Sequence, residues 1–256
     1  MFSNHIMYLY EKYERKAQFE EMNVQRVADE NIIKYFYKGS RPAFISYFKP
    51  VSLSINELIE REVAYFTKIN QPFEWKVYGL DMPTDIGKRL RAKGFIKEDV
   101  ESLLVCDIRN YQIDLTTPDG VVCKKATSEQ MFREYLEVQS TEFPLDIDEE
   151  VNQHWTKYKN DKNCTIYVVY LQGKPVASAR INFTPDSIFA GIWAGTTLKE
   201  YRGKGYYQML LNYRIDEAKQ RGRQYMAIDA LPSSRPIVEK HGFEFITSIT
   251  PYIYRP

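Results

Sequence analysis

The feature that most constrains the fold of this sequence is a turn rich in glycine and positive charge, placed between a strand pattern and a helix pattern. An apolar, strand-like run from Ile188 to Thr197 leads into Arg202-Gly203-Lys204-Gly205, and a helix-periodic segment follows at once. Glycines let backbone N–H groups approach a bulky anion without a Cβ in the way. The first turn of a helix adds unpaired amides and the positive end of its dipole. The sequence therefore predicts a polyanion site at this turn, most simply for a pyrophosphate.

Size and composition exclude several classes of protein. The chain has 256 residues, of which 44% are apolar and 27% charged, enough to bury the cores of two domains. Lys plus Arg (35) balances Asp plus Glu (34), which argues against a dedicated nucleic-acid binder. No apolar run approaches the roughly 20 residues of a membrane helix, and the N-terminus lacks a secretion-signal pattern. We expect a cytoplasmic protein with no nucleic-acid or membrane partner.

The cysteines do not suggest a disulfide framework or a metal site. Cys106, Cys123 and Cys164 are far apart, odd in number, and form no Cys-x-x-Cys pair. Each lies in or beside a strand-like run. We therefore expect free, buried thiols and no bound metal.

The chain reads as two halves of alternating strand and helix patterns. Polar, turn-forming residues at 116–120 predict a boundary between them. The first half predicts a helix over 6–21, strands over 32–37 and 43–48 around a turn at 38–42, a helix begun by a Ser54–Glu57 capping box, a strand over 74–78 and a helix over 83–93. The second half predicts a strand over 121–126, helices capped by Ser128 and Asp148, a hairpin of 165–171 and 175–183, a strand over 188–197, a helix to 221, a strand over 224–230 and a short helix ending at 242.

A short internal echo links the halves. Residues 75–95 read as strand, loop, helix and Lys-Gly-Phe, and residues 225–243 read as strand, loop, helix and His-Gly-Phe. With the similar half lengths, this predicts two related domains.

Three phosphate-binding motifs compete for the glycine turn. A dinucleotide fingerprint needs a third glycine where Gln208 stands. A P-loop needs Gly-Lys-Ser/Thr, which Tyr206 and Tyr207 do not supply. Neither motif fits.

The third motif resembles the acyl-CoA turn of the GNAT acetyltransferases. Their Arg/Gln-x-x-Gly-x-Gly/Ala is similar to residues 202–207, and residues 239–243 look like the family's next motif, a short helix ending in Gly-Phe. The resemblance implies an α/β (α+β) GNAT acyl-CoA N-acyltransferase fold, a mixed, mostly antiparallel sheet flanked by helices, in two tandem related domains. Residues 1–115 would be a degenerate GNAT-like domain without the glycine turn. Residues 121–256 would be the acetyl-CoA-binding catalytic domain.

The resemblance also implies roles for individual residues. The pyrophosphate of CoA would lie on backbone amides of Arg202, Gly203, Lys204, Gly205, Tyr206 and Tyr207. The pantetheine arm would pair with Thr196 and Thr197 like an extra strand in a splayed sheet. A backbone N–H near residues 195–197 would polarise the thioester carbonyl.

Two departures from the family pattern stand out. Tyr207 occupies a position that is usually small, and because its helical register matches that of Leu211 and Ile215 we expect its ring to pack inward. Val238 and Leu231 stand where many relatives have a tyrosine acid and an asparagine. The familiar general acid is therefore missing.

The sequence offers three candidates for the general base. Glu142, His154 and Asp229 are candidates, although His154 also reads as a helix-surface histidine and Asp229 as a residue that orders the next turn. The acids of segment 146–150 would either attract a cationic amine or cap a helix. Trp193 would either line the acceptor cleft or lie in the core.

These observations favour an acetyl-CoA-dependent N-acetyltransferase that transfers an acyl group to a primary amine by direct attack on the thioester. Acetyl-CoA would be the co-substrate, and a small-molecule or peptide amine the acceptor, with a homodimer possible. A non-catalytic acyl-CoA-binding or sensing protein is the alternative, because the acid is missing. An interaction protein that uses its tyrosine-rich first half is a third reading.

Overall fold

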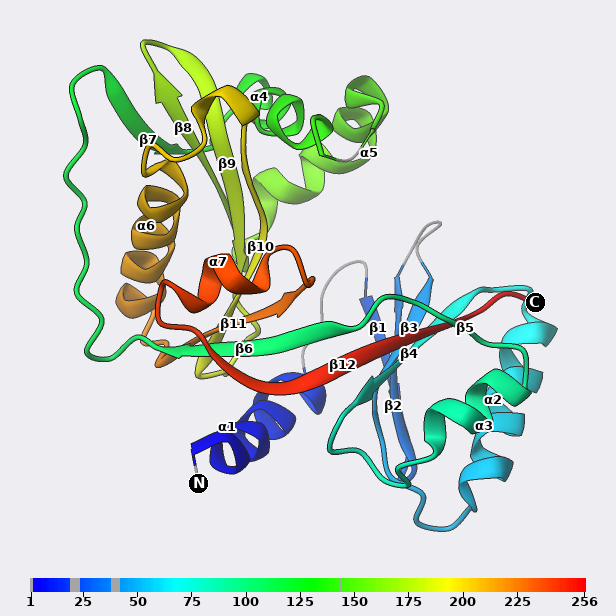
Figure 1. The fold of residues 1–256 in the computed structure, drawn as a ribbon. Coiled ribbons are helices and arrows are strands. Elements are labelled where there is room, and N and C mark those ends of the chain that lie inside the picture. Colours follow the sequence, from blue (N-terminus) through cyan, green and yellow to red (C-terminus); the bar gives the residue numbers. More distant parts are fainter. Residues whose placement is uncertain (1, 19–23, 38–41, 143) are drawn as a thin grey trace. The chain divides into compact units, whose positions relative to one another are not determined.

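The computed structural model describes residues 2–18, 24–37, 42–142 and 144–256, and the turn predicted at 38–42 lies outside them except for Pro42 (Figure 1). The chain forms two compact units, Met1–Val105 with Asp229–Pro256, and Cys106–Ile228. The observed division therefore differs from the predicted 1–115 and 121–256, because the last 28 residues belong with the first unit.

The first unit is a sheet with helices. It contains α1 (Phe2–Tyr10), a π-helical turn η1 (Glu11–Arg15), β1 (Val24–Ala28), β2 (Ile32–Tyr37), β3 (Ala43–Phe48), α2 (Ile55–Lys68), β4 (Phe73–Tyr78), α3 (Ile86–Ala92), β5 (Ile96–Lys97), most of β6 (Glu101–Asp107), α7 (Arg235–Glu239) and β12 (Glu244–Tyr254). Its strand order is β1-β2-β3-β4-β12-β6, with β5 also paired to β12. Among the strand pairs described for this unit, β3–β4 is parallel and the others are antiparallel.

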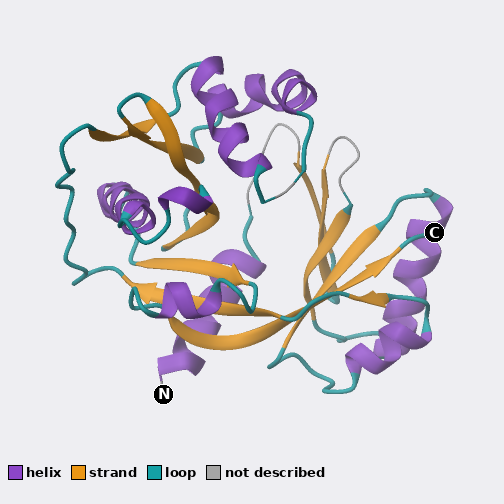
Figure 2. Ribbon diagram, turned by 45° about the horizontal axis from the view of Figure 1, so that its top comes forward, coloured by secondary structure: helices purple, strands orange, loops and turns teal. Residues whose placement is uncertain are grey.

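The second unit repeats this plan on a smaller scale. It contains β7 (Val121–Lys125), α4 (Glu129–Ser140), α5 (Ile147–Asn160), β8 (Cys164–Leu171), β9 (Lys174–Asn182), β10 (Phe189–Thr197), a 3-10 turn η2 (Lys199–Tyr201), α6 (Tyr206–Gln220) and most of β11 (Tyr225–Ala230). The strand order is β7-β8-β9-β10-β11, antiparallel except for β10–β11. Helix α6 covers one face of this sheet and α4 the other (Figures 1 and 2).

The same order of elements recurs in both units. Each has antiparallel strands, then a crossover helix that leads into a parallel strand: β3–α2–β4 in the first and β10–α6–β11 in the second. Each parallel strand is followed by a short helix that ends at a glycine with positive φ, Gly94 (92°) or Gly242 (85°). A buried phenylalanine comes next, Phe95 or Phe243. This repetition agrees with the duplication that the sequence echo predicts.

The C-terminal strand explains why the units are not contiguous in sequence. β12 pairs with β4 from Ile249↔Tyr78 to Tyr254↔Phe73, and with β6 from Glu244↔Val105 to Ile249↔Glu101. Both partners belong to the first unit. Strand β12 lies within the predicted second domain, residues 121–256, but it completes the sheet of the first unit.

Each unit buries an aromatic core. In the first, Phe66 of α2 stacks on Phe73 of β4 with ring centroids 4.0 Å apart, beside the fully buried Trp75. In the second, Phe132 of α4 packs against Tyr158 of α5 at 5.1 Å. The first contact fixes α2 on its sheet, and the second joins α4 to α5.

The helix caps follow the sequence closely. The predicted Ser54–Glu57 capping box is present at α2, and Ser128 caps α4. The cap of α5 is Asp146, which accepts from the Glu149 amide, and the prediction of Asp148 was wrong by two residues.

The cysteines are free thiols: Cys106 is buried, and Cys123 and Cys164 are half-buried. Across the described ranges, no helix is long and apolar enough to span a bilayer. No cluster of three or more potential metal ligands occurs in the same part of the chain.

Candidate functional site

The strand that leads to the glycine turn opens away from its parallel neighbour. β10 pairs with β11 only from Phe189↔Tyr225 to Gly191↔Ala227, while its pairing with β9 continues to Thr197↔Ala177. A bulge lies between Trp193 and Thr196, where Ala194 has a positive φ of 52°. From residue 192 onward, the edge of β10 that faces β11 is therefore unpaired over the described residues. An extended ligand could pair with this edge.

A buried glutamine holds the bulge in place. Gln139, near the end of α4, donates from Nε2 to the Ala194 carbonyl (2.9 Å) and to Ser178 Oγ (2.8 Å). Its Oε1 accepts from Thr196 Oγ1 (3.1 Å). Because the Gln139 side chain is buried and bonded at three points, the bulge cannot relax into a regular strand without losing these bonds. Thr196 thus has a structural side chain.

The turn itself presents unoccupied backbone amides. Gly203 and Gly205 have φ of 74° and 85°, and a Cβ added at either would meet no atom within 4 Å. Gly205 is the N-cap of α6 and offers no side-chain cap. For the N–H groups of residues 203–206, the described part of the chain supplies no hydrogen-bond acceptor. The turn is therefore open and rich in donors, as an anion site requires.

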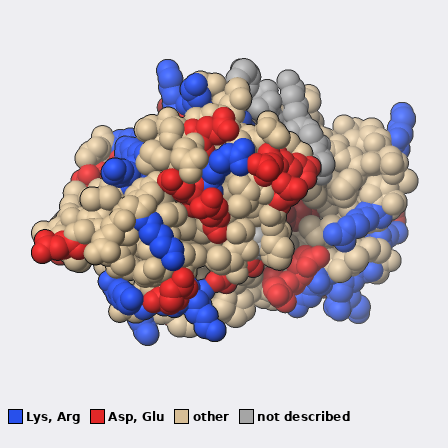
Figure 3. Space-filling model, turned by 90° about the horizontal axis from the view of Figure 1, so that it is seen from above, with Lys and Arg blue, Asp and Glu red and all other residues tan. Residues whose placement is uncertain are grey.

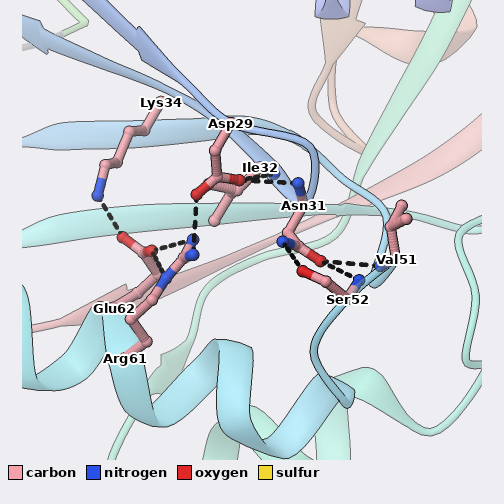
Figure 4. Close-up of polar contacts among 8 residues, drawn as sticks. All are labelled: Asp29, Asn31, Ile32, Lys34, Val51, Ser52, Arg61 and Glu62. Atoms are coloured by element: carbon pink, nitrogen blue, oxygen red, sulfur yellow. Dashed lines mark hydrogen bonds and ion pairs between the residues drawn. The ribbon is translucent and has the colours of Figure 1, made fainter.

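The matching junction of the first unit is closed by side chains (Figure 4). Between β3 and α2, Asn31 Oδ1 accepts from the amides of Val51 (2.8 Å) and Ser52 (3.1 Å). At the helix start, Ser54 Oγ accepts from the Glu57 amide (3.3 Å). The amides of Val51, Ser52 and Glu57 are thus already bonded within the first unit.

Cations surround the open turn. Arg202 donates from Nε to the Thr197 carbonyl (3.0 Å) and forms an ion pair with Glu142, which ties the turn to the strand end. Lys204 and Lys174 both lie over the ring of Tyr201, with Nζ 5.1 and 5.2 Å from its centroid. Positive charge therefore collects at the turn.

Tyr207 lies beneath the strand bulge. A Cβ added to Gly195 would be 2.9 Å from Cε2 of Tyr207, so the ring packs against the backbone of β10. The ring is half-buried, which agrees with the predicted inward packing.

A buried arginine lies beside that ring. Arg214 of α6 is 1% exposed, donates from Nε to the Leu210 carbonyl and has its guanidinium 5.9 Å from the Tyr207 centroid. Its Nη2 is buried and has no hydrogen-bond partner in the described residues. Burial lowers the pKa of Arg214, against the attraction of Tyr207. A buried cation of this kind favours negative charge nearby.

The three candidate bases have separate environments. Glu142 is exposed and paired with Arg202, beside the turn. His154 on α5 lies 3.7 Å from Glu150 in an i,i+4 pair. Asp229 belongs to the first unit, where it accepts from Lys76 Nζ at 3.0 Å. Of these, the structure brings only Glu142 to the glycine turn.

The other positions predicted from the sequence lie in different environments. Trp193 is 40% exposed, so it is not a core residue. In the acidic segment, Asp146 caps α5 and Asp148 pairs with Arg133, which supports the capping interpretation. Val238 is fully buried and Leu231 is exposed, and both belong to the first unit.

Four residues of this region were not foreseen from the sequence. Gln139, Lys174 and Arg214 contribute to the second unit, and Asn31 closes the junction of the first. Gln139, Lys174 and Asn31 contact residues more than 15 positions away, so no local spacing points to them. A polar residue inside the apolar face of α4 or α6 is the one signal that could have flagged Gln139 and Arg214.

Acidic and basic side chains alternate over the face in Figure 3, and no continuous basic field covers it. This agrees with the near-neutral net charge of +1. The charge at the glycine turn is local.

Comparison with known proteins agrees with this geometry. Residues 129–243 match the family model described as acetyltransferase (GNAT) family. This segment is a GNAT domain. It begins at α4 and includes the bulged strand, the glycine turn and α6.

Solved structures share the fold over the whole chain. A GCN5-related N-acetyltransferase from Kribbella flavida has a TM-score of 0.69 at 13% identity, over 100% of this chain and 94% of its own. A conserved protein of unknown function from Staphylococcus epidermidis has a TM-score of 0.66 at 13% identity, over 96% and 97%. A tandem GNAT protein from the clavulanic acid biosynthesis pathway has a TM-score of 0.65 at 10% identity, over 88% and 78%. No curated protein matches in sequence.

The close contact between Gly195 and Tyr207 in the GNAT domain predicts energetic coupling. Gly195→Ala should lower the free energy of unfolding by about 1–3 kcal/mol, because the added methyl overlaps the ring. In a Tyr207→Ala background, the same change should cost less than about 0.5 kcal/mol. Urea unfolding of the four proteins gives the coupling energy. Gly191→Ala, which meets Trp193 instead, should cost the same in both backgrounds, and an equal cost for Gly195→Ala in both would contradict the contact.

The acidic group around Asp229 predicts a pH dependence of stability. Burial, together with the carboxylates of Asp229 and Glu74, raises the pKa of Glu101 from 4.5 to about 7 despite the nearby Lys76. The folded state then keeps a proton that the unfolded state releases between these values, so this group makes stability fall as pH rises from 4.5 to 7.

Urea unfolding of the parent protein and Glu101→Gln at pH 5 and pH 7.5 tests this. The parent should lose more stability than the variant over this range, whereas the exposed Glu98→Gln should follow the parent. A difference between parent and Glu101→Gln that is independent of pH would rule out the shift.

Proposed function

We propose that this chain is an acetyl-CoA-dependent N-acetyltransferase that acylates a primary amine, with the second unit as the working domain. The single observation that carries the proposal is the open turn between β10 and α6. Its amides at residues 203–206 have no acceptor among the described residues, and both glycines face open space. These features fit the pyrophosphate of a CoA thioester.

The residues of the second unit divide the binding task. The amides of residues 203–206 would hold the pyrophosphate, and Lys204 and Lys174 would add positive charge. The unpaired edge of β10, ending in Thr196 and Thr197, would hold the pantetheine arm by backbone hydrogen bonds. Acetyl-CoA would supply the activated acetyl group as a thioester.

The bulge would serve the chemical step. Ala194 at positive φ turns the local amides away from the β9 ladder, and Gln139 fixes that geometry. A fixed N–H donor aimed at the carbonyl oxygen would stabilise the negative charge that develops when an amine attacks directly. The buried cation of Arg214 beneath Gly195 favours the same charge.

Proton transfer has one candidate at the turn. Glu142 is the predicted base that the structure brings beside Arg202, and it is exposed to solvent. With Val238 buried in the other unit, the leaving thiolate would take its proton from water. The identity of the acceptor amine stays open.

The first unit would act as a degenerate partner domain. At its junction between β3 and α2, the amides of Val51 and Ser52 are bonded to Asn31 and the amide of Glu57 to Ser54. An anion would have to displace both side chains to bind there, so we assign CoA binding to the second unit alone.

A matched pair of glycine variants tests the binding site. Gly205 and Gly222 lie at opposite ends of α6, both have positive φ (85° and 71°), and both face open space. Asp is among the residues that tolerate this backbone conformation. Gly205→Asp should weaken acetyl-CoA binding at least about tenfold by repelling the pyrophosphate, a loss of about 1.4 kcal/mol. Gly222→Asp should bind like the parent.

Calorimetric titration with acetyl-CoA, with urea unfolding to confirm folding, gives the comparison. Equal affinity of Gly205→Asp and the parent, or equal losses in both variants, would contradict the assignment. Release of free thiol with a panel of amines then separates an enzyme from a protein that binds acyl-CoA without turnover.

A further inference from the structure

The first unit contains a charged cavity that the proposed reaction does not use. A space of about 260 Å³ opens between the β1–β2 hairpin and helix α2. Val27, Ala28 and Ile32 give it an apolar side, and Tyr65 adds an aromatic ring. Its volume lies below the roughly 300–1,000 Å³ of pockets for drug-sized ligands, so it suits a small organic molecule.

Four alternating charges line this cavity (Figure 4). Lys34 pairs with Glu62 at 2.6 Å, and their side chains are only 8% and 1% exposed. Arg61 bridges Glu62 and Asp29, both at 2.8 Å. Apolar residues of similar volume would often be as stable as a buried pair of this kind, so its stability alone does not account for it.

The carboxylate oxygens of Glu62 and Asp29 already face hydrogen-bond donors of the protein. Each Glu62 oxygen accepts from Lys34 or Arg61. Asp29 Oδ1 accepts from the amides of Asn31 (2.7 Å) and Ile32 (3.0 Å), and its Oδ2 faces Arg61. A cationic ligand would have to compete with a donor at every one of these oxygens.

Lys34 and Arg61 have more N–H donors than their hydrogen bonds use. Lys34 Nζ has one hydrogen-bond acceptor among the described residues, Glu62, and otherwise lies 4.1 Å from the centroid of the Tyr65 ring. An ammonium group and a guanidinium group both carry more N–H donors than these bonds use. The cavity thus offers spare, positively charged donors beside apolar walls.

We propose that this cavity binds a small monocarboxylate with an apolar body. The carboxylate would accept from Lys34 and Arg61, and the body would lie against Val27, Ile32 and Tyr65. The site belongs to the first unit and does not depend on acyl transfer by the second.

The experiment is ligand-observed NMR and calorimetry on the full chain, with butyrate and benzoate as probes and butyramide and butylamine as matched controls. Saturating acetyl-CoA is present so that the glycine turn is covered, and a repeat with Gly205→Asp checks for carboxylate binding there. We expect butyrate or benzoate to bind with a Kd below 1 mM (about −4 kcal/mol), and the amide and the amine at least tenfold more weakly.

Variants assign the binding to the cavity. The single variant Lys34→Met leaves the buried Glu62 carboxylate without its lysine partner and would destabilise the fold. The decisive variant is therefore Lys34→Met/Glu62→Leu, which keeps an apolar lining. It should lose carboxylate binding at least tenfold. Lys93 pairs with Glu60, an exposed residue of α2, at 2.7 Å. The control variant Lys93→Met should bind the carboxylate like the parent.

Any one of five outcomes would overturn the proposal. The first four are no carboxylate binding at 10 mM, equal binding of the amide, preferred binding of the amine, and unchanged carboxylate affinity in the double variant. Carboxylate binding that disappears in Gly205→Asp would place the ligand at the glycine turn and would also overturn it.

Discussion

The two strand–helix crossovers of this chain differ in whether their backbone amides are already bonded or left open. A helix start always leaves N–H groups without intrahelical partners, and a capping side chain is the usual remedy. At the start of α2, Ser54 Oγ accepts from a backbone amide of the helix, and Asn31 Oδ1 accepts from two amides just before it. At α6 the N-cap is Gly205, which has no side chain to offer. One fold thus appears twice in the chain, once with the junction closed and once with it open.

The open junction is useful only because the strand before it is held apart from its neighbour. β10 leaves β11 after Gly191, and Gln139 fixes the bulge that follows through bonds to Ala194, Ser178 and Thr196. Arg202 then ties the end of the strand to the turn through the Thr197 carbonyl. The splayed edge, the bulge and the open amides follow one another along residues 192–206 of the second unit. The GNAT family match covers all three of these features.

Local signals in the sequence predicted local structure well. The Ser54 capping box, the Ser128 cap, the hairpin of β8 and β9 and the glycine turn each depend on residues a few positions apart. Spacing also located α6 and the inward face of Tyr207. Strand β1 was not foreseen, because Val24–Ala28 is short and lacks a continuous apolar face. The shift of the α5 cap from Asp148 to Asp146 arose because several acids in a row can each cap a helix.

Long-range pairing was beyond the sequence. Nothing local in β12 shows that it joins β4 and β6 instead of closing the second domain, and this pairing decides where Asp229 and Val238 belong. The partners of Gln139 and Asn31 are likewise set by strands and loops distant in sequence. The residues of the open glycine turn could be named in advance, whereas the distant side chains that support it could not.

The most direct test of the central claim is a CoA titration followed by ¹H–¹⁵N NMR, with the amide signals of both crossovers assigned. The account predicts that the signals of Gly203, Lys204, Gly205 and Tyr206 shift on binding while those of Val51, Ser52 and Glu57 stay in place. Unmoved signals at residues 203–206, or equal shifts at both crossovers, would contradict it.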